Sequence, residues 1–202
     1  YESHGYPAIA DRCFENDPSD VVWRYPCNLG VLRQSLGVVV HAEHSCRMAR
    51  DWYREQIATE WQCIPLVRPD AENSDKARSL AREALNLPQK ALVICSFGFL
   101  GPTKLNDRLL HGWLRSDLAK NPNAYLIFVG ENAPGDYGEN LRTVIAQSEA
   151  ANRIFITGWT DNADYVRYLQ ASDIGVQLRA RSRGETSAAV LDCMSYGLAT
   201  LV

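Results

Sequence analysis

The sequence lacks several features that would assign its function directly. No apolar run approaches the ~20 residues that a membrane-spanning helix needs. No two cysteines form a C-x-x-C pair, and no other set of ligands is spaced closely enough for a zinc site. The net charge of -3 comes without the clustered basic excess of a general nucleic-acid binder. The composition therefore argues against a structural zinc site and against a nucleic-acid partner.

The six cysteines are spread evenly along the chain, at positions 13, 27, 46, 63, 95 and 193. Dispersed cysteines of this kind are typical of buried, reduced thiols in a cytosolic protein. Residues 1–10 are polar and contain Pro7, which is unlike a secretory leader. We therefore expect a cytoplasmic location, and peripheral association with the inner face of the membrane through segments outside this chain stays open.

From Ala91 onward, short apolar segments alternate with segments of helical periodicity. The expected strands are 91–96, 124–129, 153–157, 174–178 and 198–202, and the expected helices are 105–118, 139–150, 161–170 and 187–196. Continuously apolar strands that are separated by helices predict a parallel sheet with right-handed crossovers. The expected fold class is therefore α/β, with a doubly wound, Rossmann-like sheet that binds ligands beyond the carboxyl ends of its strands.

The first third of the sequence has a different pattern. Residues 36–40 (LGVVV) predict a buried strand and residues 46–61 a helix, after which residues 63–70 are extended and contain two prolines. One strand and one helix do not make a domain. We therefore expect residues 1–62 to be the C-terminal part of a preceding α/β domain, residues 63–72 a linker, and residues 73–202 a second domain. The last residue falls within an apolar strand, so we expect the chain to be a truncated fragment.

The segment 184–194 (GETSAAVLDCM) contains the most chemical information. Ser187, Ala188 and Ala189 would open the last helix with accessible backbone N–H groups, which is a suitable cradle for a phosphate. Glu185 and Asp192 are seven residues apart and would lie on nearly one face of that helix. Carboxylates can accept hydrogen bonds from sugar hydroxyls. The segment therefore predicts binding of a nucleotide diphosphate sugar.

Two other loops at predicted strand ends support this prediction. Residues 96–104 (SFGFLGPTK) form a glycine-rich turn in which Gly98 permits a tight loop and Lys104 can reach an anion. Gly158 and Trp159 follow another strand, where the indole could border a base. For Lys104 the alternative is a solvated side chain without a ligand, and for a tryptophan it is a core position.

Three arginines, Arg179, Arg181 and Arg183, alternate just before Gly184. Alternation prevents all three from facing one ligand, and we expect Arg183 to pair with phosphate through its guanidinium group. A solvated basic loop is the alternative interpretation.

A pair of histidines, His41 and His44, flanks Glu43 at the end of a predicted strand. A metal pair is one interpretation, but a turn after a strand does not fix two imidazoles on one side.

On these segments the chain resembles the GT-B fold glycosyltransferases of family 4, also called glycosyl transferase group 1. The resemblance covers residues 36–202. The segments that carry it are the Gly98 to Lys104 loop, 129–130, 156–158, 171–174 and 184–202.

The family helix carries a Glu-x7-Glu motif, and this chain departs from it at one position. The second acid aligns with Asp192, which looks like the acceptor of the ribose hydroxyls. The first acid falls on Gly184, so the resemblance makes Glu185 the substitute that grips the donor sugar and the candidate catalytic residue. Phe99 also stands where the family usually has an arginine.

The resemblance implies transfer of a sugar from a nucleotide diphosphate donor to an acceptor, with retention at the anomeric carbon. It implies no metal and no other cofactor, and it makes residues 1–62 part of the acceptor-side domain and residues 73–202 the nucleotide-sugar-binding domain. The acceptor, whether a glycan, a lipid-linked sugar or a small molecule, is not identified, and we expect this fragment alone to be inactive. The expected donor-binding residues are Gly98, Lys104, Gly158, Trp159, Arg183, Gly184, Glu185, Thr186, Ser187, Ala188, Ala189 and Asp192.

Two alternatives stay open. A non-catalytic nucleotide-sugar-binding module would keep the fold without the reaction. A nucleotide-sugar epimerase on the same scaffold would need further acids and histidines in the cleft.

Overall fold

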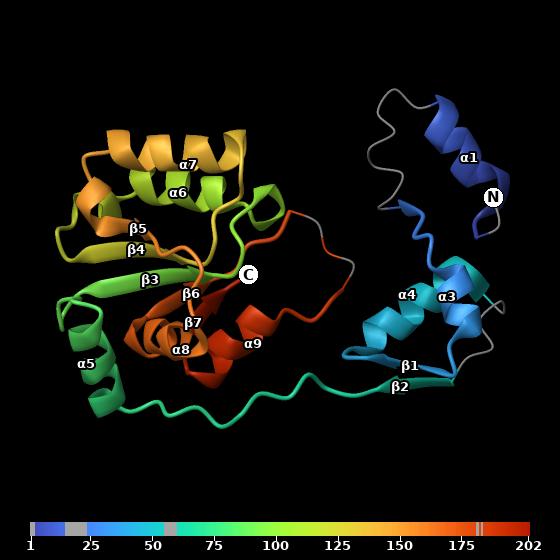
Figure 1. The fold of residues 1–202 in the computed structure, drawn as a ribbon, viewed down its shortest axis with the longest axis horizontal. Coiled ribbons are helices and arrows are strands. Elements are labelled where there is room, and N and C mark those ends of the chain that lie inside the picture. The colour runs from blue at the N-terminus through green and yellow to red at the C-terminus, as the bar shows by residue number, and fades with distance from the viewer. Residues whose placement is uncertain (1–2, 15–23, 55–59, 181, 183) are drawn as a thin grey trace. The chain divides into compact units, whose positions relative to one another are not determined.

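The computed structural model describes residues 3–14, 24–54, 60–180, 182 and 184–202 (Figure 1). The chain divides into two compact units. The first contains residues 1–67 and 183–186, and the second contains residues 68–182 and 187–202. The division between residues 67 and 68 falls inside the expected linker.

The first unit pairs two short strands with small helices. Its elements are α1 (Gly5–Phe14), α3 (Leu29–Gln34), β1 (Gly37–Val40), α4 (Glu43–Tyr53) and β2 (Glu60–Cys63). The strands β1 and β2 are parallel, with Gly37 opposite Glu60 and Val40 opposite Cys63. Leu29, Leu32 and Tyr53 form the buried centre of this unit.

Two predictions for this unit are wrong. The strand β1 is not buried, because its residues alternate between exposed and half-buried positions. The helix expected over residues 46–61 ends at Tyr53, where Arg54 adopts a left-handed φ of 50°. Glu60–Cys63 is a strand instead, because pairing with β1 outweighs its local helical pattern.

The second unit is built on a five-stranded parallel sheet. Its strands are β3 (Leu92–Phe97), β4 (Ala124–Val129), β5 (Ile154–Ile156), β6 (Ile174–Val176) and β7 (Ala199–Leu201). The spatial order is β5-β4-β3-β6-β7, and all pairs are parallel. This confirms the doubly wound α/β fold, and the order reverses between β3 and β6.

Helices cover both faces of this sheet. They are α5 (Asp75–Ala84), α6 (Asn106–Arg115), α7 (Asp136–Gln147), α8 (Asn162–Ala171) and α9 (Ala188–Ser195). Figure 1 shows α6 and α7 on one face and α5, α8 and α9 on the other. Each face therefore has its own apolar core, one centred on Leu110, Leu126 and Phe128 and the other on Val93 and Ile127.

The thiols are free, but their burial differs along the chain. Cys46, Cys95 and Cys193 are buried as expected, whereas Cys13 and Cys27 are exposed. The expectation of buried thiols is therefore correct only where the cysteine lies in an apolar strand or on the inner side of a helix.

Candidate functional site

The carboxyl ends of β3, β4 and β5 meet at a tightly packed edge. The backbone N–H of Gly130 donates to Thr157 Oγ1 at 3.0 Å, and that hydroxyl donates to the Gly158 carbonyl at 2.8 Å. A Cβ atom on Gly130 would lie 2.1 Å from the Gly98 carbonyl oxygen. Gly98, Gly130 and Gly158 therefore lie along one edge of the sheet.

The loop after β3 is held by neighbours on both sides. Gly101 N–H donates to Asn106 Oδ1 at 3.0 Å, and Lys104, which is half-buried, closes a short 3-10 turn over Pro102–Lys104. Across the reversal of strand order, Ala180 N–H donates to the Thr103 carbonyl at 2.9 Å. The loop that contains Lys104 is therefore joined to the loop after β6 at the position where doubly wound sheets bind ligands.

The start of α9 offers unpaired backbone donors. Ser187 is the N-cap, and its hydroxyl accepts from the Val190 N–H at 3.4 Å. The N–H groups of Ser187, Ala188 and Ala189 precede the first bond within the helix. Among the described residues, no group accepts a hydrogen bond from them. These three N–H groups and the helix dipole favour an anion at this end.

Glu185 does not share a helix face with Asp192, so that prediction is wrong. The cap residue Ser187 has φ -87° and ψ 114°, and the chain before it is not helical. A capping serine must leave the helical conformation so that its side chain can turn back to the helix, and this excludes Glu185 from α9.

Asp192 is held by two partners that the sequence analysis missed. Its Oδ1 lies 2.6 Å from Arg68 Nε, and its Oδ2 accepts from the Tyr165 hydroxyl at 3.0 Å. The Tyr165 ring in turn packs edge-on against Phe97, with 5.3 Å between ring centroids. Burial, and secondly the charge of Asp192, raise the pKa of Tyr165, so it remains a hydrogen-bond donor. No local pattern links positions 68, 165 and 192, so only the tertiary fold could identify these partners.

The residues Gly184, Glu185 and Thr186 pack within the first unit. Gly184 has φ +77°, and a Cβ atom there would lie 1.8 Å from His44 Cδ2. Thr186 Oγ1 donates to the His41 carbonyl at 3.5 Å, while His41 Nδ1 lies 2.8 Å from the Ile64 carbonyl. Both histidines therefore have local structural contacts, and among the described residues no group of three metal-ligating side chains lies together.

Trp159 and Phe99, which follow β5 and β3, have exposed side chains. Trp159 is 77 % exposed and follows Gly158, whose φ is +74°. Phe99 is 54 % exposed. Arg183 lies outside the described residues.

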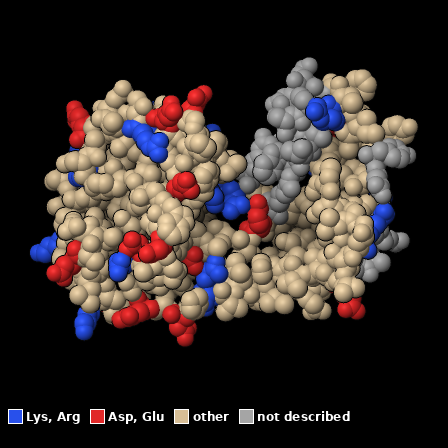
Figure 2. All heavy atoms as spheres, in the orientation of Figure 1, with Lys and Arg blue, Asp and Glu red and all other residues tan. Residues whose placement is uncertain are grey.

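On the face drawn in Figure 2, acidic and basic side chains of the second unit are interspersed rather than gathered in patches of one sign. No helix in the described part of the chain is both long and apolar enough to cross a membrane.

Comparison with known proteins identifies one matching family model. The model described as glycosyl transferases group 1 matches residues 77–202, which is more than half of the chain. No curated protein matches the sequence.

Three solved structures illustrate the fold similarity. Sucrose-phosphate synthase from Thermosynechococcus elongatus has a TM-score of 0.65 and 17 % identity over 96 % of this chain and 47 % of its own. HepE from Anabaena, in complex with UDP-glucose, has a TM-score of 0.64 and 15 % identity over 96 % of this chain and 48 % of its own. The C-terminal domain of a group 1 glycosyl transferase, LpcC from Francisella tularensis, has a TM-score of 0.54 and 22 % identity over 64 % of each chain. The chain thus spans about half the length of the first two structures.

Proposed function

The chain belongs to the glycosyl transferases group 1 family, and we propose that it contributes the donor site of an enzyme that moves a sugar from a nucleotide diphosphate sugar to an acceptor, with retention. The observation that carries the proposal is the junction between the loops after β3 and β6, where Thr103 and Ala180 are hydrogen-bonded. Lys104 belongs to the loop that this junction joins, and in this proposal that edge of the sheet binds the donor. The complex of HepE with UDP-glucose supports a donor of this class.

In this proposal the diphosphate binds to backbone donors and to Lys104. The N–H groups of Ser187, Ala188 and Ala189 are accessible at the start of α9, and Lys104 adds a full positive charge. Preorganised donors of this kind stabilise the negative charge that develops on a leaving diphosphate. They supply that stabilisation without a metal.

Asp192 would bind the ribose. A carboxylate has about four lone-pair sites, and Arg68 and Tyr165 each engage one oxygen of Asp192. The remaining lone pairs suit two neighbouring hydroxyls, and the contact with the Arg68 guanidinium group orients the carboxylate. Trp159 would border the base, and Glu185 would meet the donor sugar as the catalytic residue.

The second candidate is a nucleotide-sugar-binding module without transferase activity. It is favoured by Phe99, which replaces an expected arginine, and by Gly184, which occupies the position of the first motif acid. The acceptor is unassigned in either case.

A thermal-shift panel tests the proposal. UDP, GDP and ADP sugars should be compared on the native protein and on Asp192→Asn. We expect one nucleotide class to raise the melting temperature of the native protein and to raise it less in the variant. Stabilisation by none of them would refute the donor site, and binding without turnover of the donor in the full-length enzyme would favour the non-catalytic module.

A further inference from the structure

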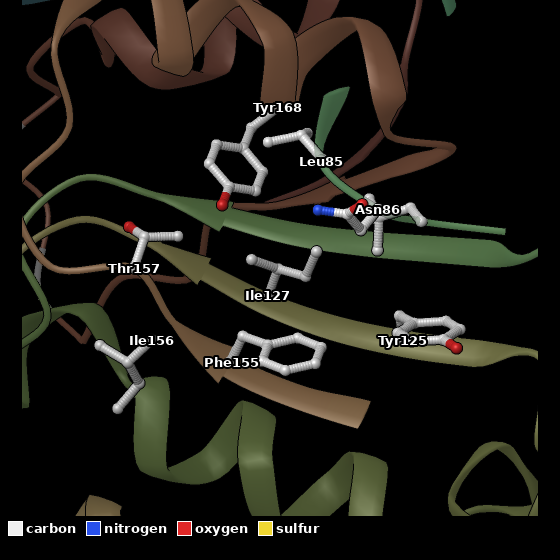
Figure 3. Close-up of a pocket in the computed structure, with 9 residues that line it drawn as sticks. Leu85, Asn86, Tyr125, Ile127, Phe155, Ile156, Thr157 and Tyr168 are labelled. Carbon is white, nitrogen blue, oxygen red and sulfur yellow. The ribbon is translucent and has the colours of Figure 1, made fainter. Parts of the chain in front are cut away.

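A groove of about 380 Å³ lies on the sheet face that carries α5 and α8. Its floor is formed by Tyr125 and Ile127 of β4 and Phe155 of β5. Figure 3 shows Leu85, Asn86 and Tyr168 on the opposite side of this space from the strands. The loops of the candidate donor site do not line the groove, except that Thr157 borders both.

The floor of the groove presents aromatic rings to solvent. The rings of Tyr125 and Phe155 come from neighbouring strands and are nearly parallel, with 12° between their planes and 6.4 Å between their centroids. Phe155 is 42 % exposed although it lies within a strand. Aromatic ring faces carry partial negative charge, so they attract the weakly positive C–H groups of a ligand.

Three polar groups around these rings have no hydrogen-bond partner within the described part of the chain. They are the Asn86 amide and the hydroxyls of Tyr125 and Tyr168. Asn86 follows the C-cap residue of α5, Leu85, and has a left-handed φ of 54°. None of the residues that line the groove is charged.

These properties select one class of occupant. A purely apolar segment would bury three polar groups without partners, and each such loss costs stability. A charged ligand would find no opposite charge among the lining residues. A neutral sugar needs no opposite charge and leaves no polar group of the groove without a partner. Its C–H face can lie on the rings while its hydroxyls bond to the amide and phenol groups.

We propose that this groove binds a neutral sugar unit of a glycan, at a site separate from the donor site. The groove is lined in part by Phe155 and Ile156 of β5, which is the edge strand of the described sheet. The proposal does not depend on which nucleotide sugar serves as donor.

Binding of linear neutral hexasaccharides tests the proposal. Maltohexaose, cellohexaose, laminarihexaose and mannohexaose should be titrated into the protein by calorimetry and by saturation-transfer NMR. We expect at least one to bind in the micromolar to millimolar range. Phe155→Leu keeps apolar area but removes the ring face, and we expect it to weaken that binding by about three- to tenfold. Phe155→Tyr should retain the binding.

Tyr168→Phe should weaken the same binding by about three- to tenfold, because it removes only a hydroxyl. Leu80→Ala, which changes an exposed apolar residue on α5 outside the groove, is the matched control and should have no effect. Absence of binding by all four saccharides, or binding that neither Phe155→Leu nor Tyr168→Phe weakens, would overturn the proposal. Nucleoside diphosphate binding, measured on the same samples, should be unchanged and reports separately on the donor site.

Discussion

At the residue scale, the candidate site depends on glycine where two loops approach each other. Gly130 has φ +152°, and its Cα lies so close to the loop after β3 that a Cβ would be 2.1 Å from the Gly98 carbonyl. The atoms that this Cβ would meet belong to the Gly98 backbone. They cannot move aside as a flexible side chain would, so one of the two loops would have to shift. The edge on which the donor would bind is therefore sensitive to a single methyl group.

We expect Gly130→Ala to lower the free energy of unfolding by roughly 1–3 kcal/mol and to weaken nucleoside diphosphate binding. Urea unfolding and calorimetry measure the two effects. Gly112→Ala in α6 is the control, since apart from its chain neighbours and the backbone of its own helix no atom lies within 4 Å of the added Cβ. There the added methyl should be neutral or should stabilise by about 0.5–1 kcal/mol. Equal stability of the two variants would contradict the argument.

Lys104→Ala should weaken nucleoside diphosphate binding by roughly 1–3 kcal/mol, because a charge-assisted hydrogen bond is lost. Isothermal calorimetry gives the affinity directly. Lys120→Ala is a matched control, because Lys120 is exposed and contacts only Asp117 among the ion pairs of the described residues. An unchanged affinity for Lys104→Ala would remove this residue from the site.

The two acids should divide the donor between them. Asp192→Asn should weaken bare nucleoside diphosphate by roughly 1–3 kcal/mol, because the amide offers fewer acceptor sites and loses the charge that pairs with Arg68. Glu185→Gln should spare that ligand but weaken the complete nucleotide sugar. If both variants damage bare nucleotide binding equally, the division is wrong.

At the scale of elements, a buried ion cluster joins α5 to the beginning of β6. Arg82 is 1 % exposed, and its side chain donates to the Ala171 carbonyl at 2.9 Å and to Asp173 Oδ2 at 2.9 Å. The same carboxylate pairs with Arg78 and accepts from the Val93 N–H at 2.7 Å. Asp173 therefore connects a helix to two neighbouring strands at the edge opposite the candidate site.

Removing the Arg82 side chain leaves the buried Ala171 carbonyl without this donor, while Arg78 still pairs with Asp173. We therefore expect Arg82→Ala to lower the free energy of unfolding by about 1–3 kcal/mol. Arg78→Ala should cost about 0–1 kcal/mol, because its side chain is 36 % exposed and solvent screens its pair with Asp173. Denaturant unfolding of both variants tests the difference. A smaller loss for Arg82→Ala than for Arg78→Ala would show that the cluster does not support α5.

At the scale of the whole molecule, two buried thiols make the free energy of unfolding depend on pH in the alkaline range. Burial raises the pKa of Cys95 from 9.0 to about 12 and that of Cys193 from 9.0 to about 11. Since each folded pKa lies above the unfolded value, the folded protein retains protons that the unfolded chain releases. Their contribution to stability is complete below pH 9 and is lost as pH rises toward 11 and 12.

The free energy of unfolding should therefore fall between pH 9 and pH 11. Each thiol contributes a slope of up to ~1.4 kcal/mol per pH unit. Urea unfolding at several pH values measures this slope. Cys193→Ala removes one of these thiols and should flatten it by up to that amount, although the variant is less stable at neutral pH. An identical slope in the variant would contradict the assignment.

The sequence by itself determined the parallel α/β architecture and the five strands of the second unit, because apolar periodicity is a local property. The same local patterns identified the glycine turns of the candidate site. Local patterns predicted neither the strand β2 nor the exposed positions of β1, because both follow from how segments distant in sequence come together. Only the tertiary structure showed Arg68 and Tyr165 on Asp192, Glu185 outside α9, and Tyr125 beside Phe155. Contacts between residues far apart in sequence depend on strand order and packing, which local periodicity does not encode.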